Sequence, residues 1–343
     1  MKHTLTALVL GAALLLASSG SGYAQNFDRG FEAFKKGDYA TALSEWQSRA
    51  NLGSSSAQFN LGLMYEKGLG VAIDHKESAR WYHKSAAQGD LQAQVALGEK
   101  YSKGLGVIQD FKEALALYQK AAEHGSLVGQ EKLGWMYSKG LGVPRDLQAA
   151  AKWYRLAAEQ GSVFAQLSLG SIYISEEGFV KDYNEAAIWF RKAADQGDAD
   201  AQYYLGWMYS NGKGLSQNEE EAAVWYLKSA EQKNAYAQNN LGVMYYQGAG
   251  VGRDVSEAVR WYLLSAKQGN TDAQLNLGRL YFNGDGVPKS LVRAHMWWNI
   301  SASNGQQKAL EARNILANEM THEEIVEAQE LARECVRKKF KGC

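Results

Sequence analysis

The sequence has few cysteines, no net charge and no long apolar segment after its N-terminus, and each of these absences argues against particular classes of protein. Lysine plus arginine and aspartate plus glutamate number 37 each, so nothing indicates nucleic acid or an anionic membrane as a general target. Beyond the N-terminal region no segment is long and apolar enough to span a bilayer. The only two cysteines are Cys335 and Cys343, at the extreme C-terminus.

The sequence also lacks the common signatures of catalysis and metal binding. H-E-x-x-H and G-x-S-x-G are absent, and the six histidines do not fall at ligand spacing. Ser210 and Lys213 match the spacing Ser-x-x-Lys, but they lie in a loop that other repeats spell Ser-Lys-Gly, so chance explains the match. We therefore expect no enzyme activity, no cofactor and no metal.

A nine-residue pattern, A-Q-x-x-L-G-x-x-Y, recurs at a constant step of 36 residues without insertion. A period of this length is typical of stacked supersecondary units, each of which buries its apolar face only against its neighbours. Such a chain adds core repeat by repeat, so one elongated all-α domain is expected. The pattern begins at Ala57, Ala93, Gly129, Ala165, Ala201, Ala237 and Ala273.

These starting points divide the chain into four parts. Residues 1–24 read as a signal peptide, 25–56 as a divergent tetratricopeptide-like first repeat, and 309–343 as C-terminal capping helices with a basic tail. Between them lie the seven repeats of 57–308, with the boundaries 57–92, 93–128, 129–164, 165–200, 201–236, 237–272 and 273–308.

Each repeat is predicted to contain two helices joined by a glycine-containing loop. In the fifth repeat Ala201, Leu205 and Met208 form an apolar face at helical spacing. Gly206 lies in the middle of that helix, where glycine is unfavourable, so we expect the paired helix to approach closely at this point. A large side chain at Gly170, the equivalent position in the fourth repeat, should therefore be destabilising.

The loop glycines are expected to end each first helix with left-handed backbone angles. The fourth repeat departs from this pattern, with Glu176 at the first glycine position and Gly178 at the second, so its loop should differ locally. Another glycine stops each second helix. Lys233 replaces it in the fifth repeat, and we expect a strained or altered junction there.

Good N-capping residues occupy one column and mark the start of each second helix. The column reads Asp74, Asp110, Asp146, Asp182, Asn218, Asp254 and Ser290. Glutamates three residues later are expected to complete capping boxes, namely Glu77, Glu113, Glu185, Glu221 and Glu257. Thr321 with Glu324 should form another and open the final helix. Aromatic pairs such as Trp225 and Tyr226 repeat in register, so we assign them to core packing.

The two ends of the chain carry signals of their own. Lys2, an apolar run and small residues up to Ala24 favour export, with cleavage after Ala24 and a periplasmic or secreted mature protein. In an oxidising compartment Cys335 and Cys343 could pair with each other, pair with a second chain or stay free. A helix would hold them too far apart, so an internal bridge requires the chain to turn back near Gly342. The basic cluster at residues 337–341 is interpreted as a solvated helix end.

The full pattern is A-Q-x-x-L-G-x-x-Y, then G-x-G-V, Asp, Ala-x-x-Trp-Tyr and Ala-Ala-x-x-Gly. It resembles the Sel-one-like repeat, a longer relative of the tetratricopeptide repeat. The closing run from Met320 to Arg333 also resembles the tail of bacterial members. The resemblance implies a right-handed α-solenoid of antiparallel helix pairs that serves as an adaptor or scaffold for other proteins. Secreted bacterial members are associated with envelope, signalling and host-interaction roles.

If the helix order resembles that of the tetratricopeptide fold, the first helices line a concave surface that exposes the third, seventh and tenth positions of each repeat. These columns vary, as a surface that reads one partner would, whereas the Leu, Gly and Tyr columns are uniform. Tryptophan, tyrosine and arginine are the residue types that dominate interface energy. The candidates for partner binding are Trp135, Tyr203, Trp207, Asn239, Tyr246, Arg279 and Phe282.

Three classes of function stay open at this point. The leading hypothesis is a non-catalytic scaffold that binds a protein or peptide in the concave groove. A second is a cell-wall protein that binds peptidoglycan or sugar through exposed aromatic residues. The third, a β-lactam-binding or hydrolysing enzyme, is prompted by cysteine-rich relatives, but those carry a cysteine pair in every repeat and this sequence does not.

Overall fold

The computed structural model describes residues 24–175, 180–340 and 342–343. Within these ranges the chain forms 18 α-helices and no β-strand, which confirms the all-α prediction. No helix in the described ranges is long and apolar enough to cross a membrane. The predicted signal peptide and the exceptional loop residues Glu176 and Gly178 fall outside the described residues, apart from Ala24.

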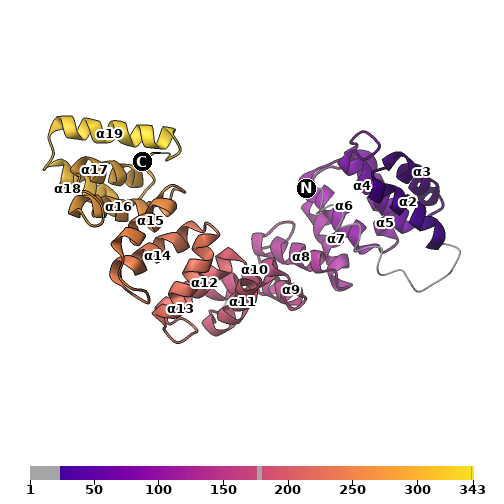
Figure 1. Cartoon of the computed structure of the whole chain (residues 1–343). Helices are drawn as coiled ribbons and strands as arrows, with labels where there is room; N and C mark the ends of the chain where they lie inside the picture. The colour runs from indigo at the N-terminus through magenta and orange to yellow at the C-terminus, as the bar shows by residue number, and fades with distance from the viewer. Residues whose placement is uncertain (1–23, 176–179, 341) are drawn as a thin grey trace. The chain divides into compact units, whose positions relative to one another are not determined.

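The helices pair in chain order, two to each repeat (Figure 1). The first helices are α4 (Ser55–Lys67), α6 (Leu91–Lys103), α8 (Leu127–Lys139), α10 (Val163–Ile174), α12 (Ala199–Asn211), α14 (Ala235–Gln247) and α16 (Thr271–Asn283). The second helices are α5 (His75–Ala87), α7 (Phe111–Glu123), α9 (Leu147–Glu159), α11 (Tyr183–Asp195), α13 (Glu219–Glu231), α15 (Val255–Ala266) and α17 (Leu291–Ser303).

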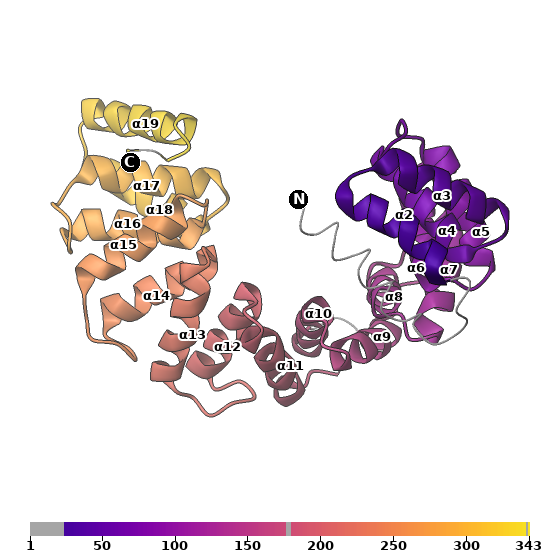
Figure 2. The same ribbon diagram turned by 45° about the vertical axis from the view of Figure 1, so that its right-hand side comes forward.

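The chain divides into two compact units. The N-terminal unit extends to Gln160 and contains α2 (Ala24–Lys36) to α9, with α2 packed on α3 (Tyr39–Asn51) and α3 on α4. The C-terminal unit runs from Gly161 to Cys343 and contains α10 to α19. Its last two helices, α18 (Gln307–Ala317) and α19 (His322–Arg337), both pack on α17 and cover the end of the stack (Figure 2).

The mid-helix glycines let an aromatic ring of the second helix lie directly on the first helix. A Cβ atom at Gly170 would lie 2.7 Å from Cδ1 of Phe190, and one at Gly206 would lie 2.6 Å from Cδ1 of Tyr226. The ring at this point is always the second member of the aromatic pair, and Phe190 and Tyr226 are buried. The predicted close approach is confirmed. The gain in burial offsets the roughly 1 kcal/mol that glycine costs within a helix.

The loop glycines have two separate roles. The first, such as Gly212, ends the first helix with a left-handed backbone (φ 62°). The second packs on the previous repeat, because a Cβ at Gly142 would lie 2.6 Å from the carbonyl carbon of Phe111. Helix α10 ends differently, because its C-cap Ser175 has an extended backbone (ψ 146°) in place of a left-handed glycine.

The predicted N-caps are confirmed, but five of the predicted capping boxes are wrong. Asp254 accepts hydrogen bonds from the backbone N–H groups of Ser256 (2.9 Å) and Glu257 (3.0 Å). Its own N–H donates to the carbonyl of Tyr245 (2.9 Å), at the end of the first helix, and is not left for the glutamate. The same tyrosine carbonyl bond occurs in all seven repeats. The glutamates concerned are Glu77, Glu113, Glu185, Glu221 and Glu257; the box of Thr321 and Glu324 is present.

Buried glutamines at the second position of the pattern join neighbouring repeats. Nε2 of Gln202 donates to the carbonyl of Ala194 near the end of α11 (3.2 Å), and its Oε1 accepts from Nε2 of Gln232 at the end of α13 (2.8 Å). Gln238 makes the corresponding bonds to Ala230 (3.0 Å) and Gln268 (2.8 Å). Gln202 and Gln238 therefore each link the second helix before them to the second helix after them.

Two of these joints are incomplete. The second helix ends at His124 or Asn304 where other repeats have glutamine, and these side chains bond to the carbonyls of Lys120 and Ile300 of their own helices. The buried Oε1 atoms of Gln94 and Gln274 consequently have no hydrogen-bond partner within the described chain.

The junction after α13 is strained, as the sequence predicts. Lys233 takes a φ of 70°, whereas the equivalent position in the next repeat is Gly269 with a φ of 89°. Side chains with a Cβ are disfavoured in this region of backbone space.

Cys335 and Cys343 form an internal disulfide bond, one of the alternatives left open by the sequence. Lys339 and Phe340 have φ values of 50° and 60°, and the N–H of Phe340 donates to the carbonyl of Cys335 (2.8 Å). This turn brings the two cysteine Cα atoms to 5.8 Å. It also stacks the ring of Phe340 on Trp297 of α17, with centroids 6.4 Å apart.

Candidate partner-binding surface

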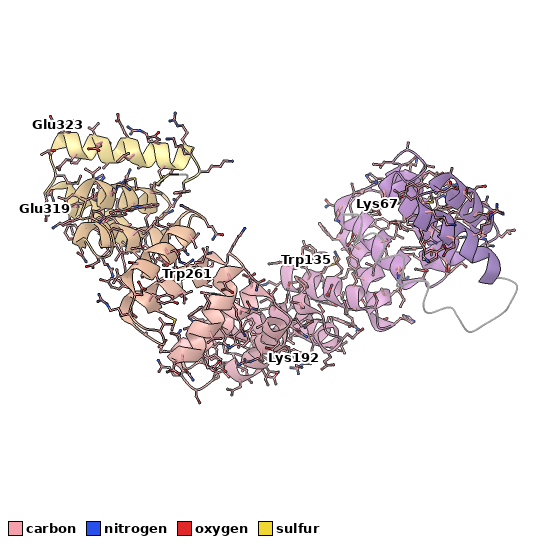
Figure 3. All side chains as sticks on the ribbon, in the orientation of Figure 1. Lys67, Trp135, Lys192, Trp261, Glu319 and Glu323 are labelled. Carbon is pink, nitrogen blue, oxygen red and sulfur yellow. A yellow bond between two sulfur atoms is a disulfide. The ribbon has the colours of Figure 1, made fainter. Side chains whose placement is uncertain are left out.

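The seven predicted contact residues fall in both units and are described unit by unit. Trp135 lies on α8 in the N-terminal unit and is 36% exposed (Figure 3). The remaining six lie on the first helices of the C-terminal unit, two on each of α12, α14 and α16. We call these six the first-helix face: Tyr203, Trp207, Asn239, Tyr246, Arg279 and Phe282.

On α12, Tyr203 and Trp207 are one turn apart and only partly exposed. Both pack against the buried core of α13 and α14. The Tyr203 ring lies 6.0 Å from that of Tyr226, and the Trp207 ring lies 6.2 Å from that of Tyr183. Each residue therefore combines a fixed, packed side with a side open to solvent, the combination found at interface hot spots.

On α14, Asn239 and Tyr246 connect to the next repeat. Asn239 is buried, and its Oδ1 accepts a hydrogen bond from Nδ2 of Asn276 on α16 (3.1 Å). The hydroxyl of Tyr246 donates to Oδ2 of Asp285 in the loop after α16 (2.9 Å). This hydrogen bond and partial burial raise the pKa of Tyr246. Asn239 is thus mainly a joint between helices, whereas Tyr246 is a positioned aromatic group at the surface.

On α16, Arg279 is exposed and Phe282 is partly covered. The positive charge of Arg279 acts to lower the pKa of both Tyr246 and Tyr262, against the burial that raises it. The Phe282 ring lies 5.8 Å from that of Trp298, and Nζ of Lys289 lies 5.8 Å above it. This end of the first-helix face therefore combines aromatic rings with basic groups.

In the N-terminal unit two glutamates of the corresponding columns, Glu66 and Glu99, form ion pairs with lysines of other columns. Lys100 Nζ lies 3.3 Å from Glu66 Oε2, and Lys132 Nζ lies 2.6 Å from Glu99 Oε1. The hydroxyl of Tyr82 also donates to Glu66 Oε2 (3.1 Å). Burial raises the pKa of Glu66, but the hydrogen bond from Lys67 and the charge of Lys100 outweigh it and leave that pKa below its ordinary value.

Sequence reasoning missed Lys100, although the signal was available. Its side chain is 3% exposed, and burial lowers its pKa. It occupies the column that elsewhere holds only apolar residues, namely Met64, Met136, Ile172, Met208, Met244 and Leu280. A lysine in a core column indicates a nearby partner of opposite charge, which here is the half-buried Glu66.

No metal site is formed by the described residues, which contain no group of three or more histidine, cysteine, aspartate or glutamate side chains placed to hold an ion. Ser210 and Lys213 each interact with another residue. The Ser210 hydroxyl donates to Glu219 (3.3 Å), and Nζ of Lys213 lies over the ring of Tyr183 (5.6 Å).

Comparisons with known proteins identify the family. The model of the Sel1 repeat, the Sel-one-like repeat of the sequence analysis, matches seven times, at residues 55–90, 91–126, 127–162, 163–198, 199–234, 235–270 and 271–306. The chain belongs to the Sel1 repeat family. Proteins of this family generally act as scaffolds for protein–protein interaction.

Two solved structures are similar over most of the chain. A Sel1 repeat protein from Oxalobacter formigenes is 30% identical, with a TM-score of 0.68 over 86% of this chain and 90% of that one. A protective antigen present in uropathogenic Escherichia coli strains, which displays an SLR fold, is 32% identical, with a TM-score of 0.61 over 88% of this chain and 73% of that one. A search of curated proteins found no match.

Proposed function

We propose that this protein is a non-catalytic scaffold that binds a protein or peptide through its first helices, with the first-helix face as the main contact surface of the C-terminal unit. The observation that carries the proposal is the contrast between columns. The uniform Leu and Gly columns are buried and build the repeat, and the uniform Tyr column is buried or half-buried, whereas the varied columns place Trp207, Tyr246 and Arg279 partly or fully at the surface. Aromatic and arginine side chains held by packing lose little entropy on binding, so they are suited to carry interface energy.

Capture of partners from an envelope extract tests the proposal. The bait is the chain from Gln25, beside a variant that combines Tyr246→Ala with Arg279→Ala. Arg333→Ala serves as a matched control, because Arg333 is exposed on α19, away from the first helices. Circular dichroism must show equal helicity in all three.

We expect a partner that the parent chain and Arg333→Ala retain and the double variant loses. Truncation of hot-spot residues costs roughly 2 kcal/mol or more each, enough to remove a micromolar partner from a washed resin. Equal retention by all three baits would exclude the first-helix face as the contact surface.

We also propose that the protein acts outside the cytosol. The signal-like residues 1–24 and the disulfide of Cys335 with Cys343 support this, since disulfides form and persist in oxidising compartments. N-terminal sequencing of the protein recovered from cells should give Gln25 as the first residue. Recovery of the full-length chain from the cytosol would contradict the proposal.

A further inference from the structure

Three tyrosines at the start of α12 and α14 form a partly exposed aromatic cluster. Tyr203 and Tyr204 have ring centroids 5.3 Å apart, and Tyr236 lies 5.8 Å from Tyr203. Tyr204 is held in place by stacking on Phe190, with centroids 4.6 Å apart and planes 11° from parallel. Tyr236 is 62% exposed. We call Tyr203, Tyr204 and Tyr236 the tyrosine cluster.

Two aspartates lie in the first turns of the neighbouring first helices: Asp200 on α12, one turn before Tyr204, and Asp272 on α16. Burial is the main cause that raises the pKa of Tyr203 and Tyr204, and the charges of Asp272 and Asp200 raise it further. Both aspartates are exposed, and each accepts a hydrogen bond from a neutral amide. Nε2 of Gln306 donates to Asp272 (2.6 Å) and Nδ2 of Asn234 donates to Asp200 (2.8 Å), so the carboxylate charges are not neutralised.

Other aromatic rings of the C-terminal unit carry a cation of this chain. Lys213 lies over Tyr183 (5.6 Å), Arg253 over Tyr246 (5.8 Å) and Lys228 over Trp225 (4.1 Å). In the part of the chain that the structure describes, no lysine or arginine lies over any ring of the tyrosine cluster. The cluster thus has the π-faces and the negative border that attract a cation, but no cation from its own fold.

We propose that the tyrosine cluster, with Asp200 and Asp272, binds a lysine or arginine side chain of the protein partner. This inference rests on the proposed function and names the chemistry of the partner at that end of the surface. One ammonium or guanidinium group can lie within about 6 Å of two ring centroids that are 5.3–5.8 Å apart. The opposite end, with Arg279, Arg253 and Lys289, carries basic groups and does not favour a second cation.

The N-termini of the helices are unfavourable for a bound cation, and the carboxylates offset this effect. The start of a helix carries a partial positive charge of about half a unit, which would repel an incoming cation. In α12 that charge faces the N-cap Asp198 and Asp200 in the first turn, and Asp272 lies in the first turn of α16. Full negative charges thus outweigh the partial positive ones around the rings.

The probe is Nα-acetyl-lysine methylamide, with the norleucine analogue as a neutral control of similar shape and choline as a non-peptide cation. The mature chain, with its tyrosine rings labelled with carbon-13, is titrated by NMR at constant ionic strength. We expect the resonances of Tyr203, Tyr204 and Tyr236 to shift saturably with the lysine probe in the millimolar range. The norleucine probe should leave them in place.

Paired variants at one exposed position separate recognition from folding. Tyr236→Phe keeps the aromatic face and should change the affinity less than about twofold, whereas Tyr236→Leu should lower it roughly fivefold or more. Asp200→Asn with Asp272→Asn should weaken binding similarly, and Glu330→Gln on α19 should not.

Four outcomes would overturn the inference: no saturable shift with lysine, an equal shift with norleucine, binding of choline alone, or unchanged affinity in Tyr236→Leu. If the lysine probe fails while partner capture still depends on Tyr246 and Arg279, the inference falls and the proposed function stands.

Discussion

The incomplete glutamine joint at Asn304 allows a substitution that should stabilise the protein. In complete joints a glutamine ends the second helix, and its Nε2 lies 2.8 Å from the buried Oε1 of the glutamine at the second position of the pattern. Asn304 is one methylene shorter and bonds to the carbonyl of Ile300 in its own helix (3.0 Å). Asn304→Gln should reach Oε1 of Gln274, which has no partner within the described residues.

The magnitude follows from the cost of an unsatisfied buried acceptor, roughly 1–3 kcal/mol. Ordering one further rotatable bond offsets about 0.5 kcal/mol of this. We therefore expect Asn304→Gln to raise the free energy of unfolding by about 1 kcal/mol, or the melting temperature of the C-terminal unit by about 2–4 °C. His124→Gln should act in the same way on Gln94 in the N-terminal unit.

The assay combines urea unfolding, followed by circular dichroism, with amide hydrogen exchange in α16 and α17, because repeat stacks unfold in parts. Asn184→Gln is the control, since Asn184 is exposed on α11. Gln232→Asn, which opens a complete joint, should destabilise by about 1–2 kcal/mol. The reasoning is refuted if Asn304→Gln gives no gain in stability and Gln232→Asn no loss.

Three further predictions concern stability. Gly170→Leu should lower the free energy of unfolding by roughly 1–3 kcal/mol, because its side chain must displace the Phe190 ring; an unchanged melting temperature would contradict this. Lys233→Gly should raise it by up to about 1 kcal/mol in urea unfolding, since it relieves a φ of 70°, and a loss of stability would show that the strain is not real. Glu66→Gln should destabilise by roughly 1–3 kcal/mol, because it leaves Lys100 buried without its counter-charge. Because the pKa of Glu66 is lowered on folding, its ionised form stabilises the folded state at pH values above the ordinary pKa of 4.5. This stabilisation is lost as the pH falls through the folded-state pKa, and Glu66→Gln should lack this acid-dependent component.

The repeat architecture could be predicted because its signals are local and recur seven times. The spacing of Leu205 and Gly206 within one helix, the N-cap at Asp254 and the glycine stop replaced by Lys233 each depend on a few adjacent residues. Recurrence at a fixed step shows that these signals are not accidental, since a chance N-cap would not recur every 36 residues.

What could not be predicted depends on partners distant in the sequence. The capping boxes failed because the N–H of Asp254 is already bonded to Tyr245, nine residues earlier in the previous helix. The role of Gln202 requires Gln232, 30 residues later, and the buried Asn239 bonds to Asn276, 37 residues later. The aligned repeats differ at the varied positions, but the sequence does not reveal which of these positions neighbouring repeats cover.

Only some residues of the candidate surface could be found from the sequence, because neighbouring repeats decide which side chains stay exposed. Tyr246 and Arg279 lie in varied columns and reach the surface, and the structure adds Asp285 and Lys289 around them. Tyr236, the most exposed member of the tyrosine cluster, lies one residue before the nine-residue pattern, outside the columns considered.

Amide hydrogen exchange on the purified complex with a captured partner tests most directly the claim that the first helices bind it. We predict slower exchange in α12, α14 and α16 on binding, with little change in α11, α13 and α15. Protection confined to the second helices, or to α19, would contradict the account, because it would place the partner on surfaces that the first-helix face does not reach.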